Sequence, residues 1–293
     1  MVLLNLPNWH FQIIKNVYKV SEDMVGAQFR SQYETLTMTK NGKLYIIGIG
    51  PGSVEHLTIR ARDVLAASEH VSGNGTYLDQ IESLIDRQNV IRSSMGKEVD
   101  RAQKAVELAK TSVVSIISGG DANVYGMAGL VLEVAENSGA DIDIEVLPGV
   151  TAITASASIL GAPIVNDFAV ISLSDLLTPW DVIEKRLEAA ASVDFIISLY
   201  NPKSRQRNSN FSRAIGIIKK HKADSVTVGL VKNALRESDE EAIVTTLGEV
   251  LEYDDWVDMR TTILIGNGES RIWETANRKL IITPRGYHRK YHY

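Results

Sequence analysis

The chain has 293 residues, 44% of them hydrophobic, which is enough for one large core or two ordinary ones. Its 31 Lys and Arg against 36 Asp and Glu leave a net charge of −5, which argues against a general nucleic-acid binder. The absence of cysteine excludes disulfides, thiol nucleophiles and cysteine-ligated iron–sulfur or zinc sites.

The N-terminal part of the chain differs from the rest. Residues 1–41 carry scattered apolar side chains without a sustained period, so we expect a poorly ordered extension, or an upstream start with Met38 as the working one. This segment lacks the continuous apolar region of a signal peptide, and no stretch of the chain reads as a membrane-spanning helix. We therefore expect a cytoplasmic protein with no membrane partner.

Regular patterns begin after residue 42. The apolar run 44–49 ends in glycines, which indicates a strand buried on both faces. A helix is predicted to begin with Thr58 as its N-cap. The strand pattern returns at 113–117 and 144–147, with a helix near 124–137 between the two. Strands that alternate with helices predict a mostly parallel α/β sheet.

Gly161-Ala162-Pro163 interrupts this pattern and marks a boundary. We expect two α/β domains, 42–161 and 162–286, with a cofactor cleft between them and a tail at 287–293. The varied spacing of the later strand-like runs predicts a mixed sheet in the second domain: 194–200, 226–231, 242–246, 261–265 and 280–283.

Three glycine-containing loops follow predicted strands. Because the carboxyl ends of strands in an open sheet line one crevice, we expect the three loops to form a single ligand site. Pro51 has no N–H to offer a pyrophosphate, and the next strand ends in glycine and asparagine instead of an acid for a ribose, which argues against a nicotinamide dehydrogenase. The loops are Gly48-Ile49-Gly50-Pro51-Gly52, Ser118-Gly119-Gly120-Asp121 and Pro148-Gly149-Val150-Thr151-Ala152.

Two further features concern charge. Asp121 is either an acceptor for a ligand or the N-cap of the next helix, and both roles stay open.

The stretch 195–223 contains basic residues and no acidic ones, which indicates an anionic partner. Lys203, Arg205 and Arg207 follow a strand end, and Lys203 and Arg205 are predicted to bind carboxylates of that partner. The later basic residues are interpreted as the solvated C-terminus of a helix: Lys219, Lys220 and Lys222.

Taken together, the three loops and Thr261-Thr262-Ile263-Leu264-Ile265-Gly266 resemble the tetrapyrrole methylase family, the class III S-adenosylmethionine-dependent methyltransferases. The resemblance covers residues 42–286. Within the family, the chain is similar to the branch that methylates C17 of precorrin-3B or cobalt-factor III, a step linked to ring contraction in cobalamin synthesis. The segments that carry this likeness are Ser172–Trp180, Leu199–Arg205 and Thr283–Tyr287.

The resemblance implies S-adenosyl-L-methionine as the cofactor, a small-molecule tetrapyrrole as the substrate, a homodimer, and no metal or nucleic acid. Asp175 is a candidate for proton handling during ring contraction. Two alternatives stay open, namely a methylase of another ring position or of uroporphyrinogen III, and a non-catalytic protein that binds S-adenosylmethionine. The implied cofactor residues are Pro51, Gly119, Gly120, Asp121, Val124, Thr151, Ala152, Tyr200 and Ala234.

Overall fold

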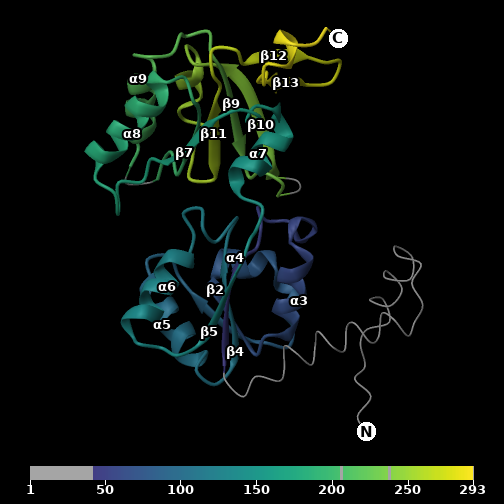
Figure 1. The fold of residues 1–293 in the computed structure, drawn as a ribbon, viewed down its shortest axis with the longest axis vertical. Coiled ribbons are helices and arrows are strands. Elements are labelled where there is room, and N and C mark those ends of the chain that lie inside the picture. Colours follow the sequence, from purple (N-terminus) through teal and green to yellow (C-terminus); the bar gives the residue numbers. More distant parts are fainter. Residues whose placement is uncertain (1–41, 205–206, 237–238, 293) are drawn as a thin grey trace, which may run out of the picture.

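Two five-stranded sheets, one in each lobe of the molecule, organise the chain (Figure 1). The computed structural model describes residues 42–204, 207–236 and 239–292, so the prediction of a disordered 1–41 segment lies outside the described residues. The expected class, an α/β protein with a parallel first sheet and a mixed second sheet, is confirmed.

The N-terminal sheet is parallel throughout, in the order β3-β2-β4-β1-β5. Its strands are β1 (Lys43–Gly48), β2 (His70–Asn74), β3 (Asn89–Ser93), β4 (Val113–Ser118) and β5 (Asp143–Leu147). The helices of this lobe are α3 (Ile59–Ala67), α4 (Gly75–Gln80), α5 (Glu98–Leu108) and α6 (Ala128–Asn137), with the short 3-10 turns η1 (Val54–His56) and η2 (Glu82–Leu84).

Alternating side chains of β1 explain its continuous apolar sequence. Leu44 and Ile46 pack with α5 and α6 on one face, whereas Tyr45 and Ile47 pack with α3 and α4 on the other. A strand covered on both faces favours apolar side chains at nearly every position. The predicted start of α3 is confirmed, because the Thr58 hydroxyl accepts a hydrogen bond from the backbone N–H of Ala61 at 3.2 Å.

The C-terminal sheet has the order β10-β9-β11-β8-β7. Its strands are β7 (Phe168–Ser172), β8 (Ile196–Tyr200), β9 (Thr227–Lys232), β10 (Glu241–Thr246) and β11 (Thr261–Ile265). Helices α8 (Trp180–Ser192) and α9 (Asn210–Ile218) cover one face and α7 (Ala152–Leu160) covers the other. A small third sheet joins β12 (Arg271–Glu274), β13 (Lys279–Ile282) and β6 (Gly161–Ala162), and the remaining 3-10 turns are η4 (Val250–Tyr253) and η5 (Tyr287–Arg289).

Helix α7 connects the two lobes in sequence and packs on the second one. Its Ile153 and Leu160 share a buried cluster with Val231 of β9 and Leu264 of β11. The domain boundary predicted at residue 161 stays a prediction, with α7 lying just before it.

The strands of the second sheet are oriented so that three of them point at the first lobe. β7 and β8 are parallel, and β9 runs in the same direction because both β8 and β9 are antiparallel to β11. Residues at or just after the ends of these three strands form hydrogen bonds with the loops after β4, β5 and β1, so the carboxyl ends of strands from both sheets face each other between the two lobes (Figure 1). Strand-end loops of both sheets meet there.

Tyr125 ties the loop after β4 to the edge strand β7. Its hydroxyl donates a hydrogen bond to the carbonyl of Val170 at 2.9 Å and accepts one from the backbone N–H of Ser172 at 3.0 Å. The Tyr125 backbone is left-handed, with φ 54°. This conformation is uncommon outside glycine, and it lets one side chain of the first lobe satisfy two backbone groups of the second.

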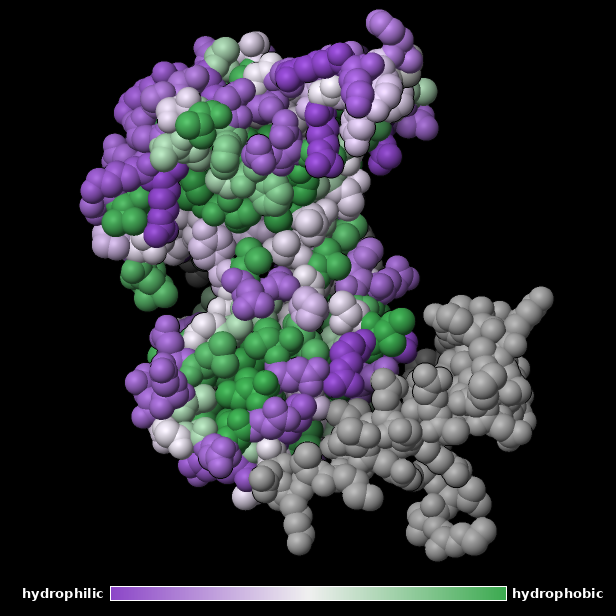
Figure 2. All heavy atoms as spheres, in the orientation of Figure 1, coloured by the Kyte–Doolittle hydropathy of each residue, from purple (hydrophilic) through white to green (hydrophobic). Residues whose placement is uncertain are grey.

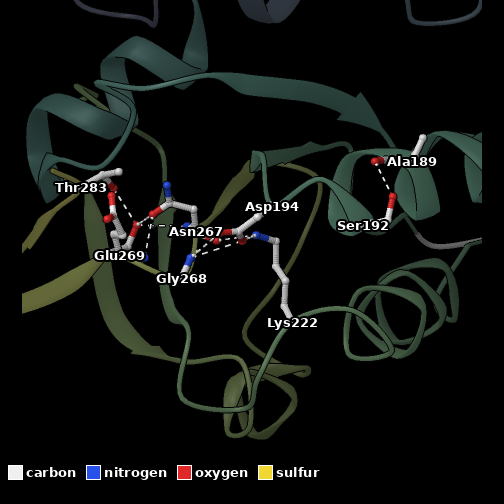
Figure 3. Close-up of polar contacts among 10 residues, drawn as sticks. Ala189, Ser192, Asp194, Lys222, Asn267, Gly268, Glu269 and Thr283 are labelled. Carbon is white, nitrogen blue, oxygen red and sulfur yellow. Dashed lines mark hydrogen bonds and ion pairs between the residues drawn. The ribbon is translucent and has the colours of Figure 1, made fainter. Parts of the chain in front are cut away.

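A buried lysine lies at the opposite end of the second sheet (Figure 3). The side chain of Lys222 is 1% exposed, and its ammonium lies 2.5 Å from Asp194 Oδ1 and 3.1 Å from the carbonyl of Gly266. The interpretation of Lys222 as part of a solvated helix end is therefore wrong. A charge this deeply buried is stable only with such partners, which the sequence brings from two distant loops.

No helix in the described part of the chain combines the length and the apolar character that crossing a bilayer requires.

We expect Tyr125→Phe to lower the free energy of unfolding by about 0.5–1.5 kcal/mol, because the ring is kept while two hydrogen bonds to β7 are lost. Urea denaturation followed by circular dichroism measures this. Tyr287→Phe is the matched control, since this exposed tyrosine forms no side-chain hydrogen bond with any described residue. Equal midpoints for the two variants would contradict a tethering role for Tyr125.

Candidate functional site between the lobes

The backbones of the three glycine loops are in direct contact. Gly50 and Gly120 form a two-way bridge, with N···O distances of 3.0 and 2.7 Å. A Cβ atom on Gly149 would lie 2.2 Å from the Gly120 carbonyl oxygen, and one on Gly48 would lie 2.7 Å from the same oxygen. Since no side chain fits at these distances, glycine is what allows the loops after β1, β4 and β5 to converge.

Asp121 fastens two of these loops together. Its Oδ1 accepts a hydrogen bond from the backbone N–H of Asn123 at 2.8 Å, and its Oδ2 accepts one from the N–H of Gly149 at 3.0 Å. The alternative role as N-cap of the next helix is wrong, because α6 begins only at Ala128 and Met127 occupies its cap position. The prediction that this helix begins near residue 124 is also wrong, because the residues just before Ala128 form turns.

Tyr200 at the end of β8 reaches the start of α7. Its hydroxyl lies 2.9 Å from the Thr151 hydroxyl and accepts a hydrogen bond from the Ile153 N–H at 2.6 Å. Burial raises the pKa of Tyr200, so the phenol stays protonated at neutral pH. The Tyr125 ring lies beside it, with centroids 5.8 Å apart. These two aromatic rings form one wall where the lobes meet.

The loop after β9 forms another contact between the second lobe and the first. Ala234 is buried between two left-handed residues, Asn233 with φ 52° and Leu235 with φ 56°. The next residue, Arg236, donates a hydrogen bond from Nε to the carbonyl of Pro51 at 2.7 Å. Non-glycine residues in this conformation are strained and are found preferentially at functional sites.

The structure brings the nine predicted cofactor residues to this one region. A Cβ on Gly120 would lie 3.7 Å from Thr151 Cα and 3.9 Å from the Ala152 nitrogen. Gly119 lies against the Tyr77 ring, since a Cβ there would be 2.5 Å from a ring carbon. Figure 2 shows the surface narrowing between the two lobes at this level. The assignment of the nine residues to a cofactor remains a prediction, now with a shared location.

The predicted substrate and proton-handling residues lie on other loops of the second lobe. The Lys203 ammonium is 2.5 Å from Asp254 Oδ2 and 2.6 Å from the Asp254 carbonyl, and its side chain is 11% exposed. Asp175 Oδ1 lies 3.9 Å from Arg207 Nε, and Arg205 falls outside the described residues. Lys203 and Asp175 form no hydrogen bond or ion pair with the nine residues in the described part of the chain. Their roles stay predictions.

Two residues of this region were not anticipated. Tyr125 belongs to the glycine loop after β4, but nothing in the sequence indicates that its hydroxyl reaches β7. Arg236 follows β9 as an isolated arginine, and only the approach of the two lobes reveals its contact with Pro51. Among the described residues, no group of His, Asp or Glu is arranged to hold a metal ion.

Comparison with known proteins identifies the class. A family model described as Tetrapyrrole (Corrin/Porphyrin) Methylases matches residues 43–251. The chain is 46% identical over 255 residues to the cobalt-factor III methyltransferase of Priestia megaterium, a match that covers 85% of this chain and 46% of that protein. It is 44% identical over 245 residues to the probable cobalt-factor III C(17)-methyltransferase of Salmonella typhimurium, covering 83% of this chain and 99% of that protein.

The solved structures agree with the sequence matches. The crystal structure of the methyltransferase CobJ superimposes with a TM-score of 0.77 at 30% identity, covering 83% of this chain and all of that one. The chain spans about half the length of the Priestia megaterium relative and nearly the whole of the Salmonella one. The protein belongs to the tetrapyrrole methylase family.

Asp121→Asn should lower the free energy of unfolding by about 1–3 kcal/mol. Both carboxylate oxygens of Asp121 accept a hydrogen bond from a backbone N–H, and the amide nitrogen that replaces one of them cannot accept. Thermal melts measure the loss. Asp141→Asn provides the control, because Asp141 is exposed and makes no side-chain hydrogen bond or ion pair with the described residues. If both variants melt with the wild type, Asp121 does not hold the loops together.

Proposed function

We propose that the protein transfers the methyl group of S-adenosylmethionine to C17 of a corrin-pathway tetrapyrrole, either cobalt-factor III or precorrin-3B. The observation that carries the proposal is the contact of the three glycine loops at the edge where the two lobes face each other. Family membership and the names of the C17-methylating relatives support the choice of donor and acceptor.

The residues at this edge fit such a donor. The loops present backbone N–H and C=O groups with few side chains, and Gly120 leaves room beside Thr151 and Ala152, because an added Cβ would come no closer than 3.7 Å to another atom. The carboxylate of Asp121 keeps lone pairs for an ammonium or a ribose hydroxyl beyond the two backbone bonds it accepts. The proline at position 51 suits a ligand without phosphates.

A sulfonium is an activated methyl donor, so the protein need not supply a covalent nucleophile. The task of the chain is to orient donor and ring carbon in line and to exclude water, which accounts for roughly 7–11 kcal/mol of a barrier in well-oriented reactions. Tyr200 and Thr151 fix the start of α7, and Tyr125 holds β7 against the first lobe. These contacts keep the two halves of the site in register.

Substrate selection belongs to the same proposal. The names of both relatives specify cobalt-factor III, which favours the cobalt-bearing acceptor. Arg205 and Lys203 remain candidates for the substrate's carboxylates, although Lys203 would have to share its ammonium with Asp254. Asp175 remains a candidate for moving a proton during ring contraction. We also propose a cytoplasmic homodimer, as the family resemblance implies, and light scattering of the purified protein tests the oligomeric state.

Mass spectrometry of reaction products tests the proposed reaction. Purified protein and a donor carrying a labelled methyl group are incubated with each tetrapyrrole in turn, and at least one of the two, cobalt-factor III or precorrin-3B, should gain one labelled methyl at C17, located by NMR. Methylation at another carbon would establish a sister activity instead. Binding of S-adenosylhomocysteine without turnover of any tetrapyrrole would show a non-catalytic binder.

Gly120→Leu should weaken binding of S-adenosylhomocysteine at least 100-fold, because the side chain would project over Thr151 and Ala152 at the donor site. Titration calorimetry gives the affinity, and a thermal melt reports on folding. Gly139→Leu is matched, since Gly139 has φ +60° against +66° for Gly120 but no atom within 4 Å of its added Cβ. Both variants share a backbone cost of about 1–2 kcal/mol. Only the first should lose affinity; undiminished affinity in Gly120→Leu removes the loop from the donor site.

A further inference from the structure

Arg236 is a cation of the second lobe that lies against the first. Its Nε donates to the Pro51 carbonyl at 2.7 Å, and its side chain covers Gly52, where an added Cβ would be 2.7 Å from Arg236 Cγ and 3.0 Å from Nε. Arg236 therefore borders the glycine loop after β1.

Among the described residues, Arg236 has no acidic partner for its charge. No carboxylate of the described residues lies within 4.0 Å of it, and its one hydrogen bond there goes to a neutral carbonyl. The neighbouring Arg260 is paired with Asp258 at 3.0 Å and adds positive charge nearby. Burial lowers the pKa of Arg236, and repulsion from Arg260 lowers it further by a smaller amount. A partly desolvated arginine in such surroundings is stabilised by an anion.

The local backbone is built to place this residue. Two left-handed residues surround Ala234, and the turn is held by Asn233 Nδ2 donating to the Asp239 carbonyl at 3.0 Å and by the Leu235 N–H donating to Glu240 at 2.9 Å. With Nε committed to Pro51, the two terminal nitrogens keep four N–H donors in one plane. That plane matches the two oxygens of a carboxylate.

We propose that Arg236 binds a carboxylate of the molecules that fill the space between the lobes. The inference rests on the proposed function, which offers two sources: the amino-acid carboxylate of the methyl donor and an acidic side chain of the tetrapyrrole. In either case the same side chain anchors the ligand and holds the loop after β9 to the loop after β1.

The variants Arg236→Gln and Arg236→Lys test the proposal. Arg260→Gln is the control, because Arg260 is a nearby arginine whose charge is already paired with Asp258. Calorimetry compares S-adenosylhomocysteine with 5′-methylthioadenosine, which keeps the adenosine and the sulfur but has no carboxylate. If the donor's carboxylate is bound, Arg236→Gln weakens S-adenosylhomocysteine about 10- to 100-fold and leaves methylthioadenosine within twofold. If a substrate carboxylate is bound, both affinities stay within twofold and the KM for the tetrapyrrole rises about 10-fold or more.

In both supporting outcomes Arg236→Lys retains part of the lost binding, because its ammonium keeps the charge but lacks the fork, and Arg260→Gln behaves as the wild type. Unchanged affinities together with an unchanged KM overturn the proposal, as does an equal loss for the two nucleosides, which would report a displaced loop. A wild-type protein that binds neither nucleoside refutes the proposed function itself, whereas wild-type binding with unaffected Arg236 variants refutes only this inference.

Discussion

The close approach of three backbone loops is the constraint on which the site depends. At Gly48, Gly120 and Gly149 the chain segments lie nearer than any side chain permits, and the bridge between Gly50 and Gly120 extends the contact beyond the sheet. The parallel order places β1 between β4 and β5, so their carboxyl-end loops are neighbours. The Asp121 carboxylate then links the β4 loop to the β5 loop, so that together with the Gly50–Gly120 bridge the three loops form one surface.

A second consequence follows from the orientation of the other sheet. Because β7, β8 and β9 all point at the first lobe, a residue at or beyond each strand end is available for contact. The backbone of β7 forms hydrogen bonds with the Tyr125 hydroxyl at Val170 and Ser172. Tyr200 at the end of β8 contacts Thr151, and Arg236 after β9 contacts Pro51. A ligand between the lobes would be surrounded by loops of both sheets. Such enclosure excludes water and favours a reaction that depends on orientation.

Charge is distributed differently from what the local sequence indicates. The basic stretch near residues 203–222 is largely neutralised by acids from other elements, as Lys203 with Asp254 and Lys222 with Asp194 show. By contrast, Arg236 stands in an acidic part of the sequence and has no acidic partner among the described residues. An anionic ligand is therefore expected near Arg236, where the two lobes meet.

The sequence by itself determined the elements whose burial is complete. β1 and β4 are covered on both faces and read as nearly continuous apolar runs, interrupted in β4 by the buried Ser115, and the Thr58 cap and the glycine loops are local signals that need no tertiary context. Together with the motif resemblance, they determined the α/β class, the mixed second sheet and the family. Strand β3 escaped prediction because its exposed, partly polar sequence carries a weaker pattern, and β7 was not predicted either although its sequence is largely apolar.

Only the tertiary structure decided which side chains meet. Spacing along the chain cannot show that Asp121 holds Gly149, that Lys203 is occupied by Asp254, or that Arg236 reaches Pro51 across 185 residues of sequence. Hydrogen bonds and ion pairs act over a few ångströms, and the partners of a polar side chain are set by the packing of sheets that the local pattern does not encode. Backbone glycines and buried strands were legible in advance because their causes are local.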